Sequence, residues 1–97
     1  MSEIGRETVL KKHPDAAHRV VDGEAVIVMP RDAKVLTLNP VGTLVWSLLE
    51  ARTVAEIATL VTDEFDVNEA RALEDTVAFL TDLQSRGMVI HPENDVR

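Results

Sequence analysis

The segment LTLNPVGTLVWSLLE, residues 36–50, constrains the fold more than any other part of the chain. A short strand-like run ends at Asn39-Pro40, and an apolar segment with helical spacing follows at once. Asn39 is a favourable N-cap residue, and the fixed φ of Pro40 suits the first position of a helix. The pattern therefore predicts a sharp switch from a strand over residues 34–38 to a helix that begins at Pro40.

Two further strands are predicted upstream of this switch. Residues 18–21 and 24–29 are rich in β-branched side chains, and Asp22-Gly23 between them is typical of a two-residue hairpin turn. With residues 34–38 these segments form a small antiparallel meander. Such a sheet needs an element packed on one face to be stable.

Two more helices are predicted downstream. Thr53 and Glu56 have capping-box spacing and open the second helix, whereas Asn68 or Asp66 caps the third. Gly87 is placed to end the third helix, and residues 88–90 read as a short closing strand. Gly42 is expected to let the first helix approach the sheet closely.

The predicted fold class is therefore α+β and winged-helix-like. A small three-stranded antiparallel sheet packs on three helices in the order β-β-β-α-α-α, with a short strand at the end. The length of 97 residues suits a single domain over 1–97, with its core at about residues 18–91.

Composition excludes several function classes. The chain has no cysteine, which removes disulfides, zinc knuckles and thiol nucleophiles. No apolar run approaches the length that spans a bilayer, so we expect a cytoplasmic protein without a membrane partner. The net charge is −7, and residues 39–97 carry eleven acidic and four basic side chains. This acidic half repels phosphate and argues against a nucleic-acid partner.

Catalytic patterns are missing from the sequence. His13, His18 and His91 are far apart, and no pair of histidines has the spacing of a metal site. Neighbouring acids such as Asp63-Glu64 point about 100° apart on a helix, so they do not form a carboxylate dyad by themselves. The four glycines are isolated, which excludes a phosphate-binding loop. We predict a protein that is not an enzyme and holds no cofactor or metal.

Three segments in register carry a family resemblance. They are LTLNPVGTLVWSLLE (36–50), TVAEIATLVTDEFDV (53–67) and VAFLTDLQSRGMVI (77–90). Together they resemble the PqqD family, also called the RiPP precursor recognition element, over roughly residues 18–91. The resemblance implies a peptide chaperone that binds the leader segment of a ribosomally made precursor peptide. The leader adds as a strand to the third strand beside the third helix, and the complex is presented to a modifying enzyme, often a radical SAM enzyme.

The resemblance places a leader-binding groove on this chain. An edge strand offers unpaired main-chain groups to a peptide, and neighbouring side chains set specificity. Lys34 and Arg86 are candidates to pair with acidic leader side chains. The predicted groove residues are Lys34, Val35, Leu36, Thr37, Ala72, Thr76, Phe79, Leu83 and Arg86.

Other interpretations stay open at the level of sequence. Core packing explains Phe79 and Leu83 as well as groove lining does, and a solvent-facing edge explains Val35 and Thr37. The chain could instead be an adaptor that docks on a biosynthetic enzyme without handling a peptide. A winged-helix DNA-binding regulator is the weaker rival, because its third helix would be acidic. The exposed strand edge is also compatible with a homodimer formed by edge pairing or strand exchange.

Overall fold

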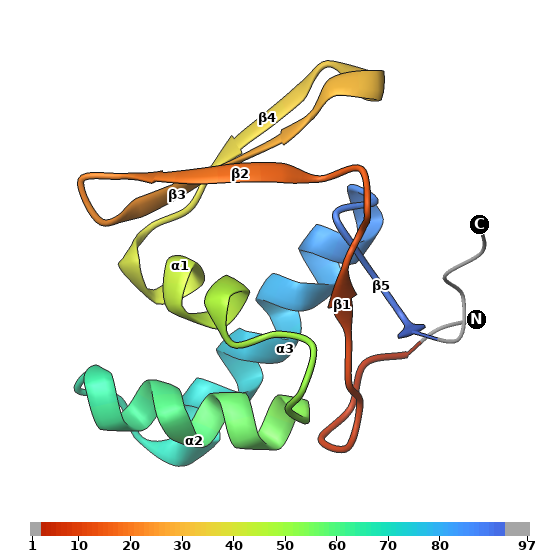
Figure 1. Cartoon of the computed structure of the whole chain (residues 1–97). Helices are drawn as coiled ribbons and strands as arrows, with labels where there is room; N and C mark the ends of the chain where they lie inside the picture. The colour runs from red at the N-terminus through yellow and green to blue at the C-terminus, as the bar shows by residue number, and fades with distance from the viewer. Residues whose placement is uncertain (1–2, 93–97) are drawn as a thin grey trace.

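The computed structural model describes residues 3–92 and confirms the α+β architecture, with a small antiparallel sheet of three strands and three helices (Figure 1). The sheet has the order β2-β3-β4, formed by β2 (Ala17–Val21), β3 (Glu24–Met29) and β4 (Lys34–Thr37). Asp22 and Gly23 join β2 to β3 with positive φ angles of 54° and 82°, the conformation of a tight hairpin turn.

The helices begin where their capping residues predict. In α1 (Pro40–Ser47) the Asn39 side chain accepts a hydrogen bond from the Gly42 amide. In α2 (Val54–Glu64) Thr53 and Glu56 form a complete capping box. In α3 (Glu69–Ser85) Asn68, rather than Asp66, caps the helix. The chain then turns at Gly87, whose φ is 76°. Each of these helix starts is thus fixed by a local side-chain hydrogen bond.

The N-terminal segment packs against the rest of the domain. β1 (Lys11–Lys12) pairs with β5 (Val89–Ile90) in a separate two-stranded sheet beside α3 (Figure 1). Leu10 is buried in the core, and its carbonyl accepts from the Glu50 amide. The expected closing strand is present, but its partner lies near the N-terminus and not in the main sheet.

The sheet covers the helices with only one of its faces, which we call the inner face. Ala25, Ile27 and Met29 of β3 are buried on this face. Residues directly opposite one another in the ladder share a face. His18, opposite Ile27, is therefore also on the inner face, and its ring meets the buried ring of Trp46 from α1 edge-on, with centroids 5.7 Å apart.

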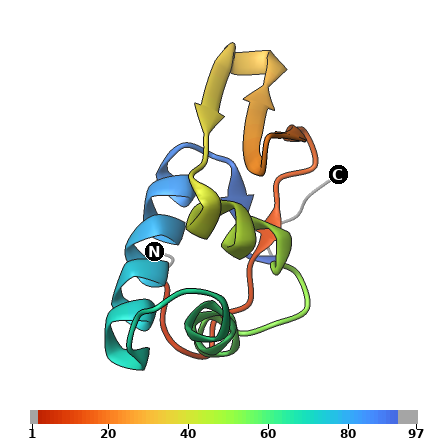
Figure 2. The same ribbon diagram turned by 90° about the vertical axis from the view of Figure 1, so that its left-hand side faces the viewer.

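Thr43 of α1 ties this helix to the end of the sheet. The Thr43 hydroxyl accepts a hydrogen bond from the Ala25 amide at 2.8 Å and donates to the Leu38 carbonyl at 3.5 Å. The Leu38 amide donates to the Ala25 carbonyl at 2.8 Å. The Thr43 side chain therefore satisfies the backbone groups at the end of the ladder. This explains why α1 can follow β4 after so short a connection (Figure 2).

Candidate functional site

The outer edge of β4 is open. β4 pairs only with β3 among the described strands, with Thr37 opposite Val26 and Val35 opposite Val28. The Leu38 amide points to β3, and main-chain groups of an antiparallel strand alternate in direction. The amides and carbonyls of Val35 and Thr37 consequently point away from β3, along the free edge. This edge offers hydrogen-bonding groups to a further strand.

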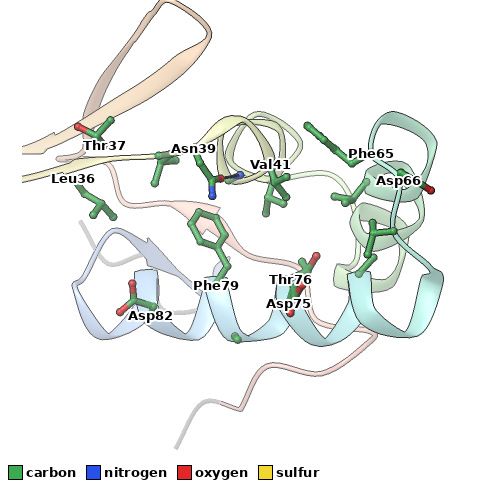
Figure 3. A pocket seen from close by; sticks show the side chains of 17 residues that line it. Leu36, Thr37, Asn39, Val41, Phe65, Asp66, Asp75, Thr76, Phe79 and Asp82 are labelled. Atoms are coloured by element: carbon green, nitrogen blue, oxygen red, sulfur yellow. Dashed lines mark hydrogen bonds between the residues drawn. The ribbon is translucent and has the colours of Figure 1, made fainter.

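A cleft of about 650 Å³ begins beside this edge and continues between the helices. Figure 3 shows Leu36 and Thr37 of β4 at one end, Phe79 of α3 in the middle and Phe65 at the other end. The cleft is therefore longer than β4 itself. Its first part lies between β4 and α3, and its second part is enclosed by α1, α2, α3 and the loop that joins α2 to α3.

Phe79 forms the wall between these two parts. Its side chain is half-buried and points from α3 towards α1 (Figure 3). A methyl group on Gly42 would lie 3.1 Å from Cζ and 3.2 Å from Cε1 of the Phe79 ring. The close approach that Gly42 permits is thus to α3 and not to the sheet, which corrects the sequence-based expectation.

The polar lining of the cleft is acidic. Asp66, Asp75 and Asp82 line it, and no lysine or arginine of residues 3–92 does. Asp75 pairs with Arg71 at 3.2 Å and Asp82 with Arg86 at 3.1 Å, each four residues apart on α3. Both pairs are solvent-exposed, so each stabilises the helix by a few tenths of a kcal/mol at most. The pairing also reduces the charge that α3 could offer to a nucleic-acid phosphate.

The structure brings five of the nine predicted groove residues together. The other four do not line the cleft: Leu83 is fully buried in the core, Val35 is 63% exposed on the opposite face of the sheet, Lys34 is exposed at the start of β4, and Arg86 pairs with Asp82 at the rim. Leu83 follows Phe79 by four residues on α3, but its side chain turns into the core instead of continuing the groove wall. The five that line the cleft are Leu36, Thr37, Ala72, Thr76 and Phe79.

Sequence reasoning missed the part of the cleft that the helices enclose. Its walls come from α1, from the end of α2 and from the connection to α3. Helical spacing identifies these residues as apolar but does not tell which face stays partly open, because that depends on how the helices cross. The missed apolar residues are Leu38, Val41, Val45, Val61, Phe65, Val67 and Ala78.

Other kinds of site find little support in residues 3–92. This part of the chain contains no group of three or more histidine, cysteine, aspartate or glutamate side chains arranged to hold a metal ion. Across the same residues, no helix has the length and apolar character needed to cross a membrane. The cleft beside β4 is therefore the main candidate for a functional site.

Comparison with known proteins agrees with this architecture. The family described as coenzyme PQQ synthesis protein D (PqqD) has a sequence model that matches residues 24–89, from β3 to β5. The chain belongs to the PqqD family. No curated protein sequence matches this PqqD-family chain.

Two solved structures share the PqqD-family fold of this chain. TbiB1 in complex with the TbiA(beta) leader peptide is 25% identical with a TM-score of 0.76, and the match covers 81% of this chain and 93% of that one. A lasso peptide synthetase B1 complexed with the leader peptide is 26% identical, also with a TM-score of 0.76. That match covers 84% of this chain and 96% of the other. Both of these similar structures are complexes with a leader peptide.

Proposed function

We propose that this PqqD-family domain binds the leader segment of a ribosomally synthesised precursor peptide and presents it to a modifying enzyme. The leader adds as a strand to the open edge of β4, beside α3. The observation that carries this proposal is the free edge at Val35 and Thr37, which borders an apolar cleft. Main-chain bonds to such an edge give affinity for an extended peptide, and the cleft beside it selects side chains.

The size of the cleft fits this role. At about 650 Å³ it falls within the range of small-ligand sites, but it is elongated and lies along a strand edge. An added strand would place every second side chain on the inner face, next to Leu36, where Phe79 and Asp82 form the opposite wall. The two similar solved structures, both complexes with leader peptides, support the same class of ligand.

Presentation without catalysis is the rest of the proposal. Within residues 3–92 the cleft is lined by apolar side chains, threonines, Asn39 and aspartates, and this described lining contains no nucleophile paired to a base. A domain of this kind raises the local concentration of a precursor near an enzyme, of the radical SAM type or another. We place the step in the cytoplasm, where a ribosomally made peptide first becomes available.

Isothermal titration tests the proposal. The protein is titrated with the leader region of the short precursor peptide encoded beside its gene, and with the core region of the same peptide as a control. We expect one-to-one binding of the leader at micromolar or lower Kd and no heat from the core region. A folded protein that gives no heat with the leader would instead favour an adaptor that recognises an enzyme alone.

A further inference from the structure

The face of the sheet that points away from the helices, which we call the outer face, is unusually apolar. In the ladder, Ala17 of β2 lies opposite Val28 of β3, and Val28 lies opposite Val35 of β4. The next row contains Arg19, Val26 and Thr37. Because these residues alternate with the buried ones of β3, they all lie on the outer face.

Apolar side chains on this face need an explanation. An antiparallel sheet with one solvated face normally alternates apolar residues inside with polar residues outside. Here the outward set of β3 contains Val26 and Val28, and its one charged member, Glu24, stands at the start of the strand. In addition, two of the three large hydrophobic side chains that are exposed in residues 3–92 lie on this face: Val21 and Val35, at 46% and 63% exposure. This concentration marks an interaction surface more than a solvent-facing one.

The outer face is continuous with the proposed leader site. Val35 and Thr37 direct their main-chain groups to the free edge and their side chains to the outer face. A leader strand added there would place alternate side chains on either side of the extended sheet. One set would enter the cleft beside Leu36, and the other would lie on the outer face beside Val35 and Thr37. A partner that contacts the outer face would therefore also contact a leader bound in the cleft.

The size of the outer face argues for such a composite surface. Three strands about 4.8 Å apart and about five residues long span roughly 14 Å by 17 Å. A standard-size interface buries about 800 Å² on each partner, so this face alone suits a weak, transient contact and not a lasting complex. A bound leader widens the face by one strand and adds its outward side chains. A partner would therefore bind the loaded domain better than the empty one.

We propose that the modifying enzyme docks on the outer face of β2-β3-β4, over Val28, Val35 and the outward side chains of the bound leader. The enzyme surface would be apolar at its centre and acidic at the position that meets Arg19. This inference rests on the proposed function, because it needs the leader on β4. The enzyme would then contact the domain and the bound leader in one interface, so it would select domains that carry a precursor peptide.

The experiment separates the two proposals by measuring two affinities for each variant. Leader affinity is measured by titration, and affinity for the purified modifying enzyme encoded beside the gene is measured by biolayer interferometry, with and without saturating leader. Val28→Lys alters the centre of the outer face, and exposed Arg19→Glu alters its rim without a packing change. Ala70→Lys on α3 and Arg6→Glu, near the start of α2, are matched controls outside both surfaces.

We expect Val28→Lys and Arg19→Glu to keep the leader Kd within about twofold and to weaken enzyme binding by about tenfold. The controls should change neither affinity. Leader should strengthen enzyme binding to the unaltered domain by about fivefold or more. Enzyme binding that both variants leave unchanged, while leader binding persists, would overturn the inference. An affinity for the enzyme that is the same with and without saturating leader would overturn the composite surface. Loss of leader binding in the unaltered domain would overturn the proposed function itself.

Discussion

The ring of Phe79 lies against the backbone of α1 at Gly42, where any side chain would reach it within 3.2 Å. This contact sets the distance between α1 and α3 in the middle of the cleft. It therefore couples the first part of the cleft, beside β4, to the part that the helices enclose.

Gly42→Ala is expected to weaken leader binding. The added methyl group would lie 3.1 Å from the ring and 3.3 Å from Asn39 Oδ1, so the ring must move into the cleft. Alanine is favoured over glycine in a helix by about 1 kcal/mol. This gain offsets the cost of the close contact, so we expect little net change in the free energy of unfolding. Titration with the leader should show a Kd raised about fivefold or more. Phe79→Leu should restore part of the affinity in the double variant, and additive effects of the two substitutions would contradict the contact.

Phe79→Ala separates groove lining from core packing. Phe79 is half-buried, whereas its neighbour Leu80 is fully buried. We expect Phe79→Ala to reduce leader affinity about tenfold or more and to cost less stability than Leu80→Ala, for which about 2–5 kcal/mol is expected. Chemical unfolding followed by the fluorescence of Trp46, the single tryptophan, gives the stabilities. A larger loss of stability for Phe79→Ala than for Leu80→Ala would identify Phe79 as a core residue.

Thr37→Pro tests strand addition at β4. Thr37 is exposed, and its amide points to the free edge, so proline removes a donor that β3 does not use. Leader affinity should fall about tenfold or more, while the unfolding transition stays cooperative. Thr37→Val keeps the amide and should bind the leader as the unaltered protein does. Equal affinities for the proline and valine variants would show that the peptide does not pair with β4 at this position.

Thr43→Val should lower the stability of the whole domain. The valine keeps the shape of threonine but leaves the Ala25 amide without the hydroxyl that accepts its hydrogen bond. An unsatisfied buried donor costs about 1–3 kcal/mol, so the denaturation midpoint should fall measurably. Thr43→Ser retains the hydroxyl and should lose less. If Thr43→Ser destabilises the domain as much as Thr43→Val does, the packing of the threonine methyl group, and not the hydrogen bond from Ala25, accounts for the loss of stability.

Local sequence patterns predicted the helix starts and the hairpin well. Asn39, Thr53 and Asn68 cap helices through hydrogen bonds to residues three positions away, and Asp22-Gly23 closes a turn of two residues. Such contacts join residues that are close in the sequence, so local sequence patterns are enough to predict them.

Long-range contacts were harder to predict. Lys11–Lys12 and Val89–Ile90 are two-residue strands almost eighty positions apart, too short for a periodic pattern. The helical part of the cleft likewise depends on how α1, α2 and α3 cross. Phe79 and Leu83 are four residues apart and therefore share a flank of α3, but only the tertiary structure shows that Leu83 is buried while Phe79 faces the cleft.

Amide hydrogen exchange of β4, measured by NMR with and without saturating leader peptide, tests the central claim most directly. Val35 and Thr37 direct their amides to the free edge, whereas the Leu36 amide already points to β3. Strand addition predicts that leader slows exchange about tenfold or more at Val35 and Thr37, and clearly less at Leu36. Bound leader that leaves the Val35 and Thr37 amides exchanging as fast as in the free protein would contradict the account.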